Sequence, residues 1–168
     1  MMVIQGGYNG EGLKVAIVVP RFNDLVTSKL LEGALDGLMR HGVSEKDITV
    51  VKIPGSMEAI YTLRKLLDLE LHDAIIVLGA VIRGETYHFN VVANEIGKAV
   101  AQFNMKSDIP IVFGVLTTDT LEQALNRAGA KSGNKGFEAA MVAIEMANLR
   151  KQLRRDLFET SNSNGRER

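Results

Sequence analysis

The segment of residues 78–94 holds the side chains best suited to chemistry in this chain. Its apolar run breaks at Gly84 into a polar stretch with Glu85, Thr86 and His88. Glycine lets a backbone approach a ligand, and loop N–H groups with a threonine hydroxyl can hold phosphate oxygens at a helix N-terminus. Because imidazole titrates near neutral pH, His88 could move protons there. The segment predicts an anion-binding loop with a proton-transfer group, although glycine loops are common in α/β proteins and a lone histidine is often only a surface residue.

Two other segments offer groups for a flat or hydroxylated ligand. Phe22 has polar neighbours, where an aromatic ring gains little unless something flat stacks on it, but a hydrophobic staple for the next helix explains it equally well. Glu58 could accept hydrogen bonds from ligand hydroxyls, although complementing the helix dipole is the more common role of an acidic residue in a helix's first turn. Ser56 is likewise a good N-cap. Each signal is weak alone, so a shared location must decide between these readings.

A basic cluster follows in residues 127–135. Arg127 is expected in the last turn of a helix and Lys135 before the next one, and basic residues near a helix C-terminus are normally structural. The stretch from Gly129 resembles a Walker A loop, but three residues rather than four separate its glycines and Asn134 precedes the lysine, which argues against nucleotide hydrolysis. What remains is a cationic loop that could face a phosphate, with Arg127 able to bind it bidentately.

Hydrophobic patterning supplies the elements that must position these residues. Short β-branched runs that are apolar on both faces predict parallel strands covered by helices on both sides. The order βαβαβαβα favours a doubly wound α/β sandwich with a four-stranded parallel sheet. The predicted strands are 14–19, 48–53, 74–81 and 111–116, and the predicted helices are 27–40, 57–69, 89–103, 120–128 and 135–157.

In such sheets, ligands bind beyond the carboxyl ends of the strands. Phe22 follows the first predicted strand, Ser56 and Glu58 follow the second, the 80–88 segment ends the third, and Phe113 is expected near the end of the fourth. We therefore expect a ring, a carboxylate with a hydroxyl, and a phosphate-type loop with an imidazole to converge at one edge of the sheet.

Composition narrows the classes of function. The chain of 168 residues has no cysteine, which excludes disulfides, thiolate nucleophiles and cysteine-ligated metals. Its 20 acidic and 20 basic side chains cancel, so no net field recruits nucleic acid or a membrane surface. The expected partner is a small molecule or another protein.

Length and patterning favour one domain over residues 1–160, followed by a flexible polar tail at 161–168. The apolar runs are too short to span a bilayer, and the first residues lack the basic and apolar regions of a signal peptide. We therefore expect a cytoplasmic protein.

Five segments together resemble the 6,7-dimethyl-8-ribityllumazine synthase family, and the resemblance spans nearly the whole chain. The joint occurrence of the RGET..H, TLEQA..RAG and GNKG segments in this order is highly specific. The segments are VVPRFND at 18–24, PGSME at 54–58, GAVIRGETYHF at 79–89, FGVLTTDTLEQALNRAG at 113–129 and GNKGFEAAMVAIEMANL at 133–149.

The resemblance implies a flavodoxin-like α/β/α sandwich and the penultimate step of riboflavin biosynthesis. In that step 5-amino-6-(D-ribitylamino)uracil condenses with 3,4-dihydroxy-2-butanone 4-phosphate, releasing phosphate and water, without a cofactor or metal. By similarity, His88 relays protons, and Glu85, Thr86 and Arg127 hold the phosphate. The residues implied for the ribitylaminouracil are Phe22, Ser56, Met57, Glu58, Ala80, Val81, Ile82, Phe113 and Lys135, with Phe113 and Lys135 coming from the adjoining subunit.

The resemblance also implies a homo-oligomer. Family members form pentamers with sites between neighbours, and many stack twelve pentamers into a 60-subunit shell; riboflavin synthase is a candidate partner. The 128–136 loop lacks the insertion of members that stop at the pentamer. Residues 2–7 could add an edge strand to a neighbouring sheet, although Gly6 and Gly7 weaken that interpretation.

The chain departs from the commonest family pattern in three places. In the second loop Met57 and Ile60 replace an aromatic residue and a proline, Asn90 replaces an acidic residue beside His88, and Tyr87 adds bulk next to the same histidine loop. Two alternatives to the enzyme therefore stay open: a structural shell protein with a decayed site, and a non-catalytic flavin or pterin carrier. Retention of His88, Arg127 and Lys135 together favours the enzyme.

Overall fold

The computed structural model, which describes residues 1–131, 133–159 and 161, contains one parallel sheet of four strands in the order β2-β1-β3-β4. This is the predicted sheet. The strands are β1 (Val15–Pro20), β2 (Ile48–Ile53), β3 (Ala74–Ile82) and β4 (Ile111–Thr118). All pairings are parallel, so the four carboxyl ends point the same way, and β2 and β4 are the edge strands.

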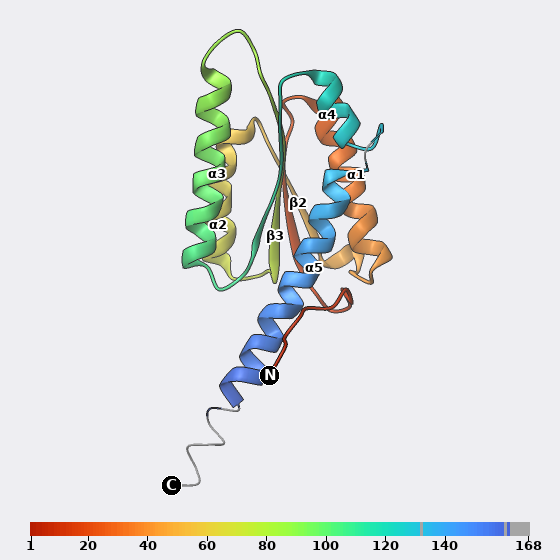
Figure 1. The fold of residues 1–168 in the computed structure, drawn as a ribbon, viewed down its shortest axis with the longest axis vertical. Coiled ribbons are helices and arrows are strands. Elements are labelled where there is room, and N and C mark those ends of the chain that lie inside the picture. The colour runs from red at the N-terminus through yellow and green to blue at the C-terminus, as the bar shows by residue number, and fades with distance from the viewer. Residues whose placement is uncertain (132, 160, 162–168) are drawn as a thin grey trace.

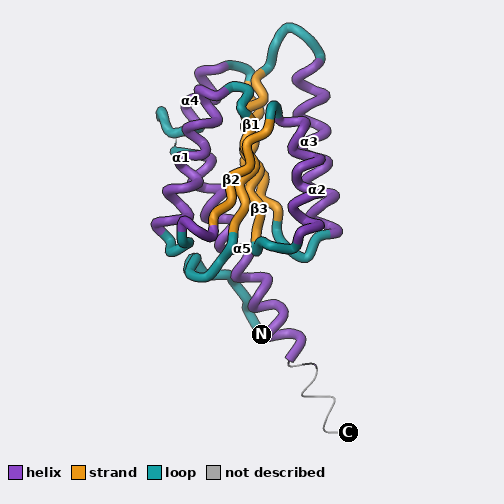
Figure 2. Tube along the Cα trace, turned by 180° about the vertical axis from the view of Figure 1, so that it is seen from behind, coloured by secondary structure: helices purple, strands orange, loops and turns teal. Residues whose placement is uncertain are grey.

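Helices cover both faces of the sheet, as the double-sided hydrophobicity of the strands predicted (Figures 1 and 2). One face packs against α1 (Asp24–Arg40), α4 (Leu121–Arg127) and α5 (Lys135–Leu153). The other packs against α2 (Ala59–Leu69) and α3 (His88–Lys106). Along β3, Ile76 and Leu78 enter the first core, whereas Ile75 and Val77 enter the second, because successive side chains of a strand point to opposite faces.

Most predicted boundaries differ from the structure by one to three residues at their ends, and one difference affects the site. β4 continues to Thr118, so Phe113 is its third residue and the prediction that Phe113 lies near the strand's end was wrong. The last predicted helix ran to residue 157, but α5 ends at Leu153 and a short π-helix, Arg154–Phe158, follows. Two 3₁₀ turns complete the described elements, Glu45–Asp47 and Ser56–Glu58.

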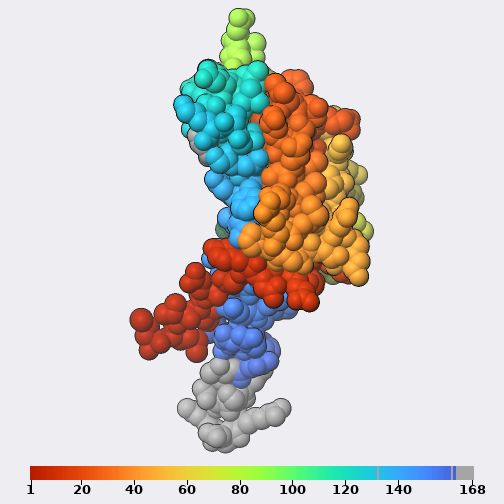
Figure 3. Space-filling view, turned by 90° about the vertical axis from the view of Figure 1, so that its right-hand side faces the viewer, coloured from red at the N-terminus to blue at the C-terminus, as the bar shows by residue number. Residues whose placement is uncertain are grey.

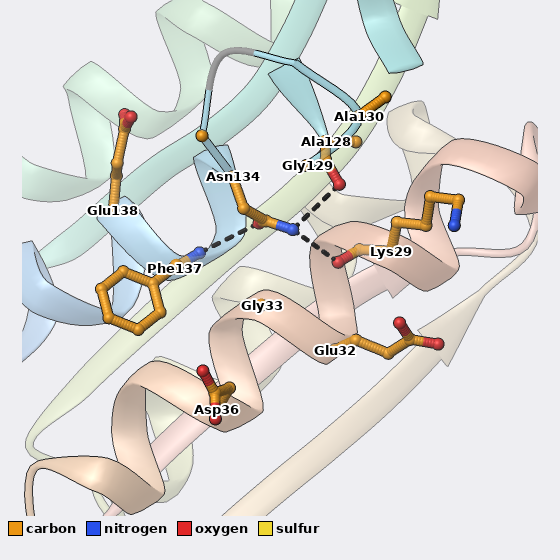
Figure 4. A pocket seen from close by; sticks show the side chains of 11 residues that line it. Lys29, Glu32, Gly33, Asp36, Ala128, Gly129, Ala130, Asn134, Phe137 and Glu138 are labelled. Carbon is orange, nitrogen blue, oxygen red and sulfur yellow. Dashed lines mark hydrogen bonds between the residues drawn. The ribbon is translucent and has the colours of Figure 1, made fainter. Parts of the chain in front are cut away.

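Asn134 fixes the junction between α1 and α5 (Figure 4). Its side-chain nitrogen donates to the carbonyl oxygens of Lys29 and Ala128, at 2.9 and 3.0 Å, and its oxygen accepts from the first turn of α5. A Cβ at Gly33 would overlap this amide, and a Cβ at Gly136 would overlap the carbonyl oxygen of Leu30. The residues that line the hollow of about 720 Å³ beside Asn134 therefore belong to the junction that holds α1 and α5 together.

The N-terminal segment runs along the far end of α5, away from the carboxyl edge of the sheet (Figures 1 and 3). The Tyr8 hydroxyl donates to Glu145 at 3.0 Å, which raises the pKa of Tyr8. The Asn148 amide donates to the carbonyl oxygens of Gly7 and Asn9, both at 2.9 Å. Residues 2–7 form no strand within the subunit. Their pairing with a neighbouring sheet stays a prediction.

In the part of the chain that the structure describes, no helix is both long and apolar enough to cross a membrane. The tail predicted at 161–168 lies outside the described residues except for Ser161, whose hydroxyl donates to the carbonyl oxygen of Phe158 at 2.8 Å. The division into one domain with a polar tail remains a prediction.

Candidate active site

A cavity of about 410 Å³ opens at the carboxyl ends of β1, β2 and β3. The loops after these three strands supply its walls, which is where parallel sheets place ligands. The convergence predicted from the sequence is therefore confirmed for three of the four loops. The lining residues are Phe22, Asn23, Pro54, Gly55, Ser56, Met57, Glu58, Ala80, Val81, Ile82, Gly84, Thr86, His88, Phe89 and Val92.

The loop after β1 presents Phe22 with 71% of its surface exposed. Asn23 follows in the left-handed conformation (φ 61°, ψ 44°), which asparagine tolerates better than most residues. Its side-chain nitrogen donates to the carbonyl oxygen of Ala80 at 2.7 Å, beyond the last β1–β3 pair at Val18 and Val77. An exposed ring beside a cavity is available for stacking on a planar ligand.

The loop after β2 forms a 3₁₀ turn at Ser56–Glu58, directly before α2. Ser56 makes no capping hydrogen bond, so its interpretation as an N-cap was wrong and its hydroxyl lines the cavity instead. Met57 is 36% exposed at the same wall. Glu58 is exposed, and among the described residues none hydrogen-bonds to its carboxylate. Its two oxygens are thus free to accept hydrogen bonds from ligand hydroxyls.

The end of β3 contributes mainly backbone. Ala80 and Val81 are buried, whereas every residue from Arg83 to His88 is exposed. Thr86 and His88 line the cavity, and Glu85 lies outside its lining. His88 is the first residue of α3, where backbone N–H groups have no partner within the helix and favour an anion.

The basic residues lie elsewhere on the subunit. Arg127, at the end of α4, and Lys135, at the start of α5, line a second cavity of about 590 Å³ along the edge strand β4. Lys135 also lies 3.7 Å from the carboxylate of Glu138. Phe113, 37% exposed, lines a third hollow that shares Lys135. Within one subunit, Arg127, Lys135 and Phe113 therefore do not line the cavity that holds Phe22 and His88.

The first cavity can stack a planar ring, bind hydroxyls, hold an anion beside a helix start and move a proton at His88. The described residues contain no group of three or more His, Cys, Asp or Glu side chains arranged for a metal ion. No cofactor or metal is part of the expected reaction, and that expectation stays a prediction.

Sequence reasoning placed two residues of this edge without giving them a role. Asn23 stands between a strand and a helix, where asparagine signals a left-handed turn, but only the fold shows that its amide reaches Ala80. Arg83 begins the polar loop, and only the fold shows that it contacts Asp119 and Phe89.

Known proteins resemble this chain along nearly its whole length. A family model described as 6,7-dimethyl-8-ribityllumazine synthase matches residues 12–151. The 6,7-dimethyl-8-ribityllumazine synthases of Thermotoga petrophila and Thermotoga maritima are 89% and 88% identical to this chain over 166 residues, which is 99% of this chain and 100% of each relative. That of Kosmotoga olearia is 61% identical over 153 residues, covering 91% of this chain and 98% of its own. Because the family model spans most of the chain and these relatives match it nearly end to end, the chain belongs to the 6,7-dimethyl-8-ribityllumazine synthase family.

Proposed function

We propose that this chain makes 6,7-dimethyl-8-ribityllumazine from 5-amino-6-(D-ribitylamino)uracil and 3,4-dihydroxy-2-butanone 4-phosphate, in a site shared by two neighbouring copies. The main support for a shared site is that the groups expected to act together line two separate cavities of one subunit. Phe22 and His88 line one cavity, whereas Arg127 and Lys135 line another along the edge strand β4. A second copy that docks its β4 edge against the first cavity would bring the two sets together.

In this arrangement one subunit binds the uracil. The Phe22 ring stacks on the pyrimidine, backbone groups at 80–82 bind its edge, and Ser56 with Glu58 binds the ribityl hydroxyls. Met57 contacts the same chain without the ring surface of an aromatic residue. The neighbour's Phe113 and Lys135 close the other side of the ring.

The phosphorylated substrate lies over the start of α3. Glu85 and Thr86 approach it from the first subunit, and the guanidinium of Arg127 from the neighbour binds the phosphate bidentately. Imine formation, phosphate elimination and ring closure each move a proton, and His88 lines the same cavity. Alignment of the two reactants supplies most of the rate, since no covalent intermediate with the protein is required.

The assembly that supplies the neighbour is a pentamer, with a 60-subunit shell as its larger form. Exposed apolar side chains accompany the β4 edge and support such a contact: Phe113, Leu121, Val142 and Met146 are 37%, 45%, 45% and 39% exposed. Five chains of 18.4 kDa give about 92 kDa, and sixty give about 1.1 MDa, so a mass measurement separates the two forms. Action in the cytoplasm and contact with riboflavin synthase belong to the same proposal.

Subunit complementation tests the shared site. The variants His88→Ala and Arg127→Ala are purified separately and then unfolded and refolded together. If the two residues act in one site from different subunits, about a quarter of the sites in a random mixture regain both side chains, and activity returns well above either variant alone. Activity that stays at the sum of the separate variants would contradict a shared site.

The reaction is assayed directly on the wild-type protein by lumazine absorbance and phosphate release. Product formation with both substrates supports the enzyme. Assembled particles without product would instead favour a structural shell, and a tightly bound yellow chromophore without phosphate release would favour a carrier.

A further inference from the structure

Residues 83–87 form a loop with little packing of its own. The loop rises above the carboxyl edge of the sheet between β3 and α3, and it projects from the body of the subunit (Figures 1 and 3). All five residues are exposed, and a Cβ added at Gly84 would meet no atom within 4 Å. The path of the loop must therefore be set mainly by contacts at its two ends.

Arg83 makes contacts in three directions at the start of this loop. Its backbone N–H donates to the carbonyl oxygen of Thr118 at 2.9 Å, which extends the β3–β4 pairing by one bond. Its Nε donates to Oδ1 of Asp119 at 2.8 Å. Its guanidinium carbon lies 4.5 Å from the centre of the Phe89 ring, within the range of a cation–π contact.

These contacts join both ends of the loop to each other and to β4. Phe89 directly follows His88 and packs partly buried against the core beneath α3. The Arg83 guanidinium, at the start of the loop, stacks on the Phe89 ring, just beyond its end. This contact closes a ring formed by residues 83–89, which includes Thr86 and His88. Arginine suits this place because its planar group can stack on a ring and pair with a carboxylate at once.

Asp119 is itself held in place. Its backbone N–H donates to the side-chain oxygen of Gln123 at 2.9 Å, beside the capping box that Thr120 and Gln123 form at the start of α4. The contacts of Arg83 with Asp119 and of Asp119 with Gln123 thus connect the loop to α4, the helix that ends at Arg127.

We propose that Arg83 is a positioning residue that fixes the phosphate-binding loop through Asp119 and Phe89. The proposal builds on the function proposed above for Thr86 and His88. If Arg83 bound phosphate itself, removing the Asp119 charge would have the opposite effect on substrate binding, so the two roles can be separated. Removing the Asp119 charge loosens the loop if Arg83 positions it, whereas it frees the guanidinium for phosphate if Arg83 binds the substrate.

Steady-state kinetics of Arg83→Gln, Asp119→Asn and Phe89→Leu test the role. We expect Arg83→Gln to lower kcat and to raise the KM for 3,4-dihydroxy-2-butanone 4-phosphate, each about tenfold, since small misplacements of reacting groups are costly. The KM for the ribitylaminouracil should change less than about twofold, because Phe22, Ser56 and Glu58 lie on other loops and the backbone at 80–82 is held by its pairing with β4. The other two variants should move the same two constants in the same direction, and Arg83→Gln/Asp119→Asn should be no worse than Arg83→Gln.

Arg40→Gln is the matched control. The Arg40 Nε lies 2.7 Å from Oδ1 of Asp36 in an exposed pair of the same geometry, on α1 away from the loop. Exposed pairs contribute little to stability, so both arginine variants should keep the wild-type Tm, and Arg40→Gln should also keep all three kinetic constants within about twofold. A lower KM in Asp119→Asn, or unchanged constants in Arg83→Gln, would overturn the positioning role.

A second readout needs no turnover. The chain contains no tryptophan, so Tyr87→Trp places a single indole in the loop. Its fluorescence anisotropy should fall when Arg83→Gln is added and stay constant when Arg40→Gln is added. Equal anisotropy in both would refute the proposal. If the wild-type protein forms no lumazine, the proposed function fails, and the anisotropy comparison alone decides the role of Arg83.

Discussion

The side-chain nitrogen of Asn23 donates a hydrogen bond of 2.7 Å to the carbonyl oxygen of Ala80. The bond joins the loop that carries Phe22 to the strand end that supplies backbone groups at 80–82. Asn23 reaches this carbonyl because its backbone adopts the left-handed conformation, which turns the chain sharply from β1 into α1. The distance between the Phe22 loop and the β3 backbone is thereby fixed within one subunit.

Asn23→Gly should separate the effect of the amide from that of the backbone. Glycine accepts the left-handed conformation, so the relief of strain offsets part of the lost hydrogen bond and Tm should change little. The KM for the ribitylaminouracil should rise about tenfold, the equivalent of one hydrogen bond of about 1.4 kcal/mol. Asn23→Ala, which keeps the strain and loses the bond, should raise the same KM and also lower Tm. An unchanged KM in both variants would show that this bond does not shape the uracil site.

His88→Ala should lower kcat about 10²-fold or more and leave residual activity. A positioned acid–base group contributes roughly 10²- to 10⁴-fold, and the remaining rate comes from alignment of the two substrates. Because His88 is exposed at the start of α3, the variant should fold and assemble like the wild type. Single-turnover rates of lumazine formation measure the effect. Complete loss of activity with intact binding of both substrates would mean that His88 does more than move a proton.

His72 should make the fold sensitive to acid. The ring lies between β2 and the start of β3, with Nε2 3.2 Å from the Thr49 hydroxyl, and Nδ1 is buried without a hydrogen-bond partner among the described residues. Burial lowers the pKa of His72 from its ordinary value of 6.5, with Asp73 opposing and Lys14 reinforcing the effect. Folded His72 thus binds fewer protons than the unfolded chain as the pH falls below 6.5, so the free energy of unfolding decreases in that range.

His72→Gln keeps a polar group for Thr49 and removes the titration. The wild type should lose more Tm than this variant between about pH 7.5 and about pH 5, measured by calorimetry at one protein concentration. Equal losses would assign the acid sensitivity to other groups.

Gly136→Ala should destabilise the protein by about 1 to 3 kcal/mol or more. An added Cβ would overlap the backbone of Leu30, so α5 would have to move away from α1. Gly97→Ala is the control, because Gly97 lies within α3 and a Cβ there meets nothing within 4 Å. That variant should gain about 0.5 to 1 kcal/mol from helix propensity. Thermal unfolding at fixed protein concentration measures both. A stabilised Gly136→Ala variant would mean that the two helices pack less closely than described.

The sequence by itself determined the sheet, its flanking helices and the family. Apolar residues on both faces of four short segments can be buried only in a covered parallel sheet, and the order of the RGET, TLEQA and GNKG segments identified the family before any coordinates. Phe22, Ser56, Glu58, Thr86 and His88 were expected to lie together because residues that follow parallel strands meet at one edge, and all five line one cavity.

Only the tertiary structure decided which of those groups share a cavity. Arg127 and Lys135 line a different cavity from His88, because α4 and α5 pack on one face of the sheet and α3, which begins at His88, packs on the other. The contacts of Asn23 with Ala80 and of Arg83 with Asp119 join residues 57 and 36 positions apart. Local patterns carry no information on such pairs, since packing of the sheet and helices fixes their distance.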